Sequence, residues 1–503
     1  MIKFLRLKKI KFPTAQTILL IIAGLVALLT WVIPSGKYDA LSYNKTENTF
    51  TVSSLEDNKT LAATQETLNN LDIKIPLEKF TNGDIWKPIS VPNTYKEVEA
   101  KPQGFYEFIK SPIKGIIQAA DIIFLVLIIG GLIGVINYTK AFDAGISWLS
   151  KALIGYEFLL IIFVTILIAA GGTTFGLAEE TIAFYPILIP IFLAAKYDAM
   201  VPLACIYIGS SIGTMCSTTN PFSAIIASDA AGINWTTGIE GRAIMLGLGT
   251  LICILYIIRY AQRVKKDPSK SIIFDQKEEI AQLFGNTTDA SLKLTNRLRL
   301  ILLIFITCFI VMIYGVSQLE WWFVEMTVVF LVGAIAIGVI GRIKEHNFVD
   351  LFIKGAGELL GVAIIIGIAR GVTVLMEDGQ ISDTILYYAS NATNDMNKGV
   401  FINAMLFIYS GLSFFIPSSS GMAVLTMPIM SPLADGVGIG RESIVNAYQY
   451  GMGLFNFINP TGLILASLAV VKVGYNKWLK FVMPLVIILT IFTVIFLTLS
   501  VYL

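Results

Sequence analysis

The feature that most constrains this chain is a series of long apolar segments with almost no charged side chains. Each approaches or reaches the roughly 20 residues that an α-helix needs to cross about 30 Å of hydrocarbon. The clearest are residues 18–33, 122–138, 243–258, 301–316, 326–340, 361–376 and 481–503. Charged residues make up 14% of the chain, against about 25% in ordinary soluble domains. The sequence therefore predicts an all-α polytopic membrane protein.

The distribution of lysine and arginine predicts the orientation of these spans, because cytoplasmic loops carry an excess of basic residues. Residues 1–13 contain five basic side chains and no acidic one. The segments RYAQRVKK, RIK and KVGYNKWLK follow other spans and are also basic. We expect a cytoplasmic N-terminus, an extracytoplasmic C-terminus and a multi-pass protein of a bacterial inner membrane.

Scarce residues recur at a nearly constant offset between the two parts of the chain. Pro186 and Pro190 match Pro428 and Pro432, 242 residues later, and the Asn-Pro at 220–221 matches that at 459–460. The segments from Ala119 and Ala356 also align, yet the loop charges start them on opposite sides of the membrane. This is typical of a secondary transporter built from inverted repeats.

The expected organisation has six parts. They are an N-terminal span at 1–33, an extracytoplasmic segment at 34–116, a first transport repeat at 117–260, a cytoplasmic linker at 261–297, a connecting span pair at 298–341 and a second, inverted repeat at 342–503.

Four stretches rich in Gly, Ser, Thr, Asn and Pro interrupt the apolar sequence, two in each half. We name them the first tip (171–181, GGTTFGLAEET), the first break (217–223, STTNPFS), the second tip (415–424, FIPSSSGMAV) and the second break (456–463, NFINPTGL). Irregular chain at membrane depth must line protein or a water-filled cavity. Each half is therefore expected to contain a re-entrant hairpin and a broken helix, giving about nine full spans and two hairpins.

These stretches also supply the candidate binding residues. Helix N-termini after the tips favour anionic groups, and side-chain and carbonyl oxygens at the breaks suit a hard cation such as Na⁺. The candidates for substrate or ion binding are Thr174, Gly176, Glu179, Glu180, Thr181, Ser217, Thr218, Thr219, Asn220, Ser418, Ser419, Ser420, Gly421, Asn456, Asn459, Thr461 and Gly462. Sodium is considered at the Asn220 and Asn459 breaks, and no resident cofactor or metal is expected. The alternative for the Ser, Thr and Asn residues at the two breaks is that they only satisfy backbone groups where the helices bend.

The same stretches resemble the DcuC/YfcC family of the ion transporter superfamily. The resemblance rests on TWVIPSG, VPNTY, SPIKGI, GLAEE, STTNPFS, PSSSG and NPTG, which are spread over nearly the whole chain. It implies a carrier of dicarboxylates or amino acids, with an elevator-like motion of hairpins and broken helices against a scaffold. It also implies a homodimer. For coupling, Na⁺, H⁺ and an exchanged solute are all considered.

Glu179 and Glu180 have two possible roles. As acids in the first turn of a helix they would contribute only about 0.3–1 kcal/mol, whereas an acid near the bilayer centre costs roughly 2.5–3.5 kcal/mol. Because the helix-end contribution is smaller than this cost, we expect at least one glutamate to contact a substrate amine, a proton or a cation. The second tip has no acid, so a zwitterion suits the pair. The prediction is a basic amino acid, and the alternative is a four-carbon dicarboxylate.

Four further charged residues are less distinctive. Arg370 could bind a carboxylate or pair with Glu377, and Asp229 could take part in ion coupling. Asp121 and Glu358 lie near span entrances and are expected to be interfacial.

Other functional classes find little support. The single histidine, His346, lies in a basic loop, and the sequence lacks Gly-x-Gly-Asp, His-Glu-x-x-His and Walker A motifs. An intramembrane enzyme is therefore not expected, while a passive channel is the alternative that only transport kinetics separates from a carrier. The near-neutral charge of +2 argues against nucleic acid, leaving a small-molecule substrate and the lipid bilayer as partners.

Overall fold

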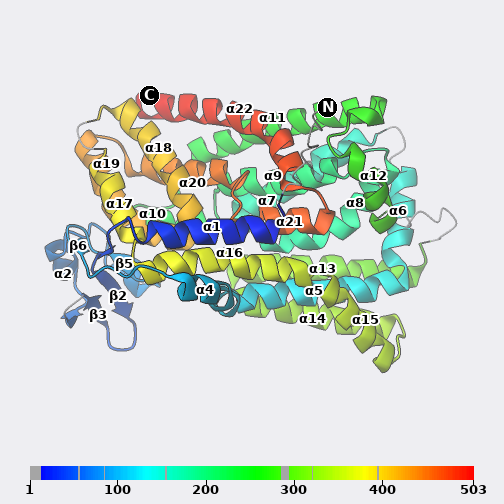
Figure 1. Cartoon of the computed structure of the whole chain (residues 1–503), viewed down its shortest axis with the longest axis horizontal. Coiled ribbons are helices and arrows are strands. Elements are labelled where there is room, and N and C mark those ends of the chain that lie inside the picture. The colour runs from blue at the N-terminus through cyan, green and yellow to red at the C-terminus, as the bar shows by residue number, and fades with distance from the viewer. Residues whose placement is uncertain are drawn as a thin grey trace, which may run out of the picture.

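The structure is a computed structural model that describes residues 13–54, 57–83, 85, 87–152, 156–284, 294–319, 321–393 and 396–502. The basic residues before position 13, on which the expected N-terminal orientation depends, lie outside the described residues, as does part of the linker. Most helices run along the long axis of the molecule, and a small group of strands lies at one end (Figure 1).

The strands form one element between the first helix and the rest of the chain. Two antiparallel sheets have the orders β1-β6 and β4-β3-β2-β5. The element consists of β1 (Gly36–Lys37), β2 (Ala40–Asn44), β3 (Thr49–Ser53), β4 (Asn58–Ala62), β5 (Ile89–Ser90) and β6 (Lys96–Glu97), with α2 (Gln65–Asn70) and α3 (Glu78–Thr81). Phe50 and Phe80 pack edge to face in its core, with ring centroids 5.1 Å apart.

The prediction of an all-α chain is wrong for this element. β3 alternates between buried and partly exposed side chains, which is the period-2 pattern of a half-buried strand. At five residues, the strand is too short for this pattern to stand out from the surrounding polar sequence. We refer to residues 34–104 as the strand element.

In the described part of the chain, eight helices are long and apolar enough to cross a membrane. They are α5 (Ala120–Thr139), α7 (Phe158–Phe175), α11 (Ile239–Lys266), α13 (Asn296–Gln318), α14 (Phe323–Ile340), α16 (Leu360–Gly379), α18 (Lys398–Phe415) and α22 (Tyr475–Tyr502). The first predicted span is the shorter α1 (Ala15–Leu29), and α9 (Met200–Met215) is likewise short. The multi-pass prediction therefore holds, with these two helices below the length of a full crossing.

Two series of eight helices follow each other, and five of the eight corresponding pairs have equal lengths. The first series is α4 (Phe105–Gln118), α5, α6 (Ala141–Ala152), α7, α8 (Tyr185–Ala194), α9, α10 (Ile226–Ala230) and α11. The second is α15 (Glu345–Glu358), α16, α17 (Ser382–Asn391), α18, α19 (Ser419–Val437), α20 (Arg441–Asn456), α21 (Ile464–Val471) and α22. In this order α4 and α15 both have 14 residues, α5 and α16 20, α7 and α18 18, α9 and α20 16, and α11 and α22 28.

The two series pack on each other reciprocally, since α4 lies along α16 and α15 lies along α5. Glycines make both crossings possible. A Cβ added at Gly115 of α4 would meet the backbone of Gly367 and Gly371, and one at Gly355 of α15 would meet the backbone of Gly130 and Gly134, all closer than 3.0 Å. Small residues let helix backbones approach closely within a membrane. Close contacts between glycines therefore join the two series at two corresponding crossings, α4 on α16 and α15 on α5.

Corresponding helices lie at opposite ends of the molecule (Figure 1). Helices α17 and α19 lie at the strand end and pack on β1 and β5, whereas α6 and α8 pack on each other at the far end. The C-terminal end of α22 is also at the strand end. The first series ends with the basic last turn of α11. Between the two series, the chain forms two short turns at Pro268–Lys270 and Phe274–Gln276, then α12 (Lys277–Phe284) and the paired helices α13 and α14.

Candidate functional site

The first tip follows α7, where the helix stops at Phe175. Gly176 adopts a left-handed conformation with φ +77°, and a Cβ there would lie 2.9 Å from the side-chain oxygen of Asn220. Only glycine readily satisfies both conditions. The chain then starts a 3₁₀ turn (η1, Glu179–Phe184) that leads into α8. Glu180 Oε2 accepts a hydrogen bond from the Ala178 amide at 3.1 Å. The helix is thus interrupted within the predicted stretch, and both glutamates begin the next turn.

The second tip follows α18, which ends at Phe415. Ser418 caps α19, because its Oγ accepts a hydrogen bond from the Gly421 amide at 3.2 Å. Tyr448 of α20 donates from its hydroxyl to the Ser419 carbonyl at 2.8 Å. The first turn of α19 therefore presents serine hydroxyls and backbone amides, groups that favour an anion.

The first break is tied to the last turn of α7. Thr173 Oγ donates to the Cys216 carbonyl at 2.8 Å and accepts from the Thr218 amide at 3.0 Å. Asn220 caps a single turn of π-helix (η2, Pro221–Ile225) by accepting from the Phe222 amide at 2.9 Å. These bonds replace the backbone bonds that the helix loses at this point.

The second break is tied to α18 in the corresponding way. Asn459 Nδ2 donates to the Ser413 carbonyl at 3.1 Å, and its Oδ1 accepts from the Thr461 amide at 3.0 Å. Asn459 is fully buried. Each Asn-Pro thus has a structural reason of its own, since the asparagine supports the turn that the proline requires.

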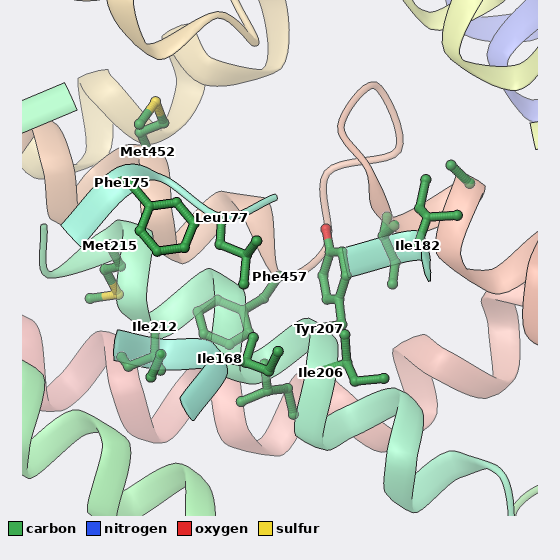
Figure 2. Close-up of a cluster of buried hydrophobic side chains, with 14 of the residues drawn as sticks. Ile168, Phe175, Leu177, Ile182, Ile206, Tyr207, Ile212, Met215, Met452 and Phe457 are labelled. Carbon is green, nitrogen blue, oxygen red and sulfur yellow. The ribbon is translucent and has the colours of Figure 1, made fainter. Parts of the chain in front are cut away.

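Apolar side chains support this region. The cluster in Figure 2 joins α7, the first tip with the η1 turn, α9, α20 and the second break. Its labelled members are Ile168, Phe175, Leu177, Ile182, Ile206, Tyr207, Ile212, Met215, Met452 and Phe457. Tyr207 also donates to the Asn456 carbonyl at 2.8 Å, which connects α9 of the first half to the second break.

A cavity of about 440 Å³ lies between the two tips and the two breaks. This is within the usual range for small-molecule sites. The predicted residues that line it are Gly176, Glu179, Glu180, Asn220, Ser418, Ser419, Ser420, Asn456, Thr461 and Gly462. The structure therefore brings residues of all four stretches together around one space.

The other predicted residues do not line this cavity. Thr174, Thr181, Ser217 and Thr219 donate to the carbonyls of Ala170, Ala178, Thr214 and Thr174, and Thr218 is bonded to Thr173. Gly421 lines a neighbouring cavity, and Asn459 supports the second break. The hydroxyls of Ser217 and the four threonines thus bond to chain groups around the tip and the break, and their part in ion or substrate binding stays a prediction.

The cavity is lined by charges of both signs. Glu179, Glu180 and Asp121 supply carboxylates from the first tip and α5. Lys87 and Arg370 supply cations from the strand element and α16. A ligand that carries both a positive and a negative group could therefore place each beside a side chain of opposite charge.

The two cations are held differently. Arg370 donates from Nε to Gln118 at 3.0 Å and lies 3.6 Å from Glu377, the ion pair that the sequence suggested. Lys87 donates from Nζ to Oγ of Ser420 at 2.7 Å. Burial lowers the pKa of Lys87, and the positive charge of Arg370 lowers it further.

Asp229 is fully buried in α10 but does not line the cavity, and Lys79 Nζ lies 2.9 Å from its carboxylate. The Asp229 carboxylate therefore contacts the strand element, and its role in ion coupling stays a prediction. Lys87, Gln118, Tyr207, Ser210, Ser211 and Trp322 line the cavity although sequence reasoning did not select them. For Lys87 no local signal existed, because its partner Ser420 is 333 residues away.

Comparison with known proteins gives three kinds of match. The model of the family described as "DcuC: C4-dicarboxylate anaerobic carrier" matches residues 12–502. An uncharacterized protein of Haemophilus influenzae is 46% identical over 482 residues, covering 95% of each chain. The "Putative basic amino acid antiporter YfcC" of Escherichia coli is 30% identical over 488 residues, covering 93% of this chain and 92% of its own.

Two solved transporters were also matched. The YdaH transporter of Alcanivorax borkumensis has a TM-score of 0.40 and 14% identity, covering 97% of this chain and 98% of its own. MtrF of Neisseria gonorrhoeae has a TM-score of 0.40 and 15% identity, covering 98% and 96%.

Proposed function

The chain belongs to the DcuC family of membrane transporters, and on that premise we propose that it carries a basic amino acid across a bacterial inner membrane. The observation that carries this proposal is the mixed charge of the cavity. Glu179 and Glu180 offer two carboxylates at one tip, while the serine-rich start of α19, with Lys87, offers a site for a carboxylate. Arginine presents a guanidinium, an ammonium and a carboxylate, and so uses both sets.

The named relative YfcC supports the same substrate class, since its printed name describes a basic amino acid antiporter. The second candidate is a four-carbon dicarboxylate, which the family description names. Lys87 and Arg370 favour it, but two unprotonated glutamates in the same cavity would repel a dianion.

The proposed mechanism is alternating access in an elevator-like motion. We propose that the two helix series form inverted repeats, each with a re-entrant hairpin and a broken helix. The matching helix lengths, the reciprocal packing and the placement of α6 and α17 at opposite ends support this. The hairpins and broken helices would move against a scaffold that includes the crossed α4–α16 and α15–α5 pairs. Such a motion requires an anchored scaffold, hence a proposed homodimer.

Orientation and coupling follow from the same proposal. The strand element and the C-terminus lie at one end of the molecule, so both are placed on the extracytoplasmic side, opposite a cytoplasmic N-terminus. Oxygens around Asn220 and Asn459 are the proposed sites for a coupling Na⁺, and the two glutamates are the proposed sites for H⁺.

Binding to the purified protein tests the substrate class. Isothermal titration with arginine and with succinate would compare wild type, Glu179→Gln and Glu180→Gln, with the exposed Glu345→Gln as control. Loss of a charge-assisted contact costs about 1.5–3 kcal/mol, so at least one cavity variant should bind arginine roughly 10–100-fold more weakly. Tight binding of succinate with no binding of arginine would instead establish the dicarboxylate alternative.

A further inference from the structure

Lys87 reaches the cavity from a part of the chain outside the helical body. It lies between α3 and β5, and β5 packs on α19. Its ammonium donates to Ser420 Oγ at 2.7 Å, in the first turn of α19. The strand element thus contributes a cation to a cavity that is otherwise built by the two helix series and the pair α13 and α14.

The strand element is anchored around this lysine at several points. Lys79 Nζ lies 2.9 Å from the buried carboxylate of Asp229 in α10. The Tyr38 amide donates to Asp383 of α17 at 2.9 Å. The carbonyl of Lys74 lies so close to Gly232 that a Cβ there would approach it to 2.6 Å. Because the element contacts α10, α17 and α19, the position of Lys87 is set by the fold.

Lys87 also separates two cavities. A second cavity, of about 450 Å³, is lined by the strand element, α16, α17 and α19. Lys87, Arg370 and Ser418 line both cavities. The second cavity lies beside the strand element, and these three residues lie where the two cavities adjoin.

The electrostatics favour an anionic group at this point. Lys87 and Arg370 are close enough for Arg370 to lower the pKa of Lys87, and burial lowers it more. A carboxylate between the two cations and the first amides of α19 relieves that repulsion, because opposite charge favours the charged form of an amine. Arg370 pairs with Glu377 and Gln118 beside this point, and Lys87 donates to Ser420 in the first turn of α19, where the helix amides also favour an anion.

We propose that Lys87 binds the carboxylate of the transported amino acid at the start of α19, which makes the strand element part of the substrate site. This inference rests on the proposed function and assigns one end of the substrate. The guanidinium or ammonium end then faces Glu179 and Glu180 across the cavity. The Ser420 hydroxyl, now the acceptor for Lys87, holds the ammonium in place until the carboxylate arrives.

The test compares arginine with agmatine, the same molecule without its carboxylate. Affinities of both ligands would be measured by titration calorimetry for wild type, Lys87→Met, Lys87→Arg and the control Lys96→Met, which changes an exposed lysine of the same element. Wild type should prefer arginine, and Lys87→Met should reduce that preference roughly 10–100-fold, the equivalent of one charge-assisted contact. Lys87→Arg should keep most of it, and Lys96→Met all of it.

The outcomes separate this inference from the proposed function. If Lys87 only anchors the strand element, Lys87→Met weakens both ligands equally and the preference stays unchanged, which overturns the inference. If wild type binds succinate and not arginine, the amino-acid proposal fails, and the same variants are compared with succinate and its monomethyl ester. Loss of discrimination by Lys87→Met then retains Lys87 as a carboxylate site, and unchanged discrimination overturns it. Binding of none of these ligands overturns both proposals.

Discussion

Replacing Gly355 by alanine should destabilise the protein, although alanine is the better helix former. Gly355 lies in α15 where this helix crosses α5. An added Cβ would come within 3.0 Å of the Gly130 carbonyl oxygen and of the Gly134 backbone. Both are backbone atoms, so neither can turn aside as a flexible side chain could. The two helices must separate, and the contacts along the crossing weaken.

The magnitude follows from a matched control in the same helix. A Cβ at Gly357, two residues on, meets no atom within 4 Å. Both substitutions gain the same helix propensity, about 0.5–1 kcal/mol. The difference between the two variants therefore isolates the overpacking, which typically costs about 1–3 kcal/mol.

The assay is unfolding in mixed micelles by titration with sodium dodecyl sulfate, which gives a free energy of unfolding for each variant. We expect Gly355→Ala to be less stable than Gly357→Ala by about 1–3 kcal/mol. The pair Gly371→Ala and Gly361→Ala repeats the comparison in α16, where only Gly371 meets backbone atoms of the facing helix. Equal stability within both pairs would refute the close crossing of α4 on α16 and of α15 on α5.

Three further predictions concern other contacts. Lys79→Met should lower the free energy of unfolding by roughly 3–5 kcal/mol, because it removes a countercharge from buried Asp229. The double variant Lys79→Met/Asp229→Asn should regain part of the lost stability. A double variant no more stable than Lys79→Met would contradict this explanation. Thr173→Val should slow transport and lower stability by about 1–3 kcal/mol, since the Thr173 hydroxyl makes three hydrogen bonds to the first break. The same change at the exposed Thr307 of α13 should have no effect. Lys477 lowers the pKa of Asp275 below 3.8. The contact therefore stabilises the linker above that pH, and the stabilisation is lost as the pH falls through the lowered pKa. Proteolysis of the linker that is equally slow at pH 3 and pH 7 would contradict this prediction.

Much of the helical framework could be predicted from the sequence because its signals are local. Apolar length marks the spans, and Gly176, Ser418 and the two Asn-Pro pairs mark where helices stop. Those residue types interrupt helices through their own backbone preferences and short-range hydrogen bonds. The positions of the tips and breaks therefore needed no knowledge of the tertiary structure.

The remaining features depend on contacts between distant parts of the chain. Lys87 is an ordinary lysine in its own segment, and only the docking of β5 on α19 brings it to Ser420. The sequence does not indicate that Asp229 contacts Lys79, because only the docked strand element places the two side by side. Thr218 and Thr219 have the same chemistry as residues that line the cavity, yet they bond to Thr173 and Thr174. Residue type alone therefore does not show whether a threonine lines the cavity or only supports the backbone beside it.

Counterflow in proteoliposomes tests the central claim most directly. Vesicles preloaded with unlabelled arginine would receive labelled arginine outside, with wild type, Glu179→Gln, Glu180→Gln and the control Glu345→Gln compared. The account predicts transient accumulation of label with wild type and the control, and its loss with at least one cavity variant. Accumulation of labelled succinate alone, in succinate-loaded vesicles and with both cavity variants as active as wild type, would contradict it.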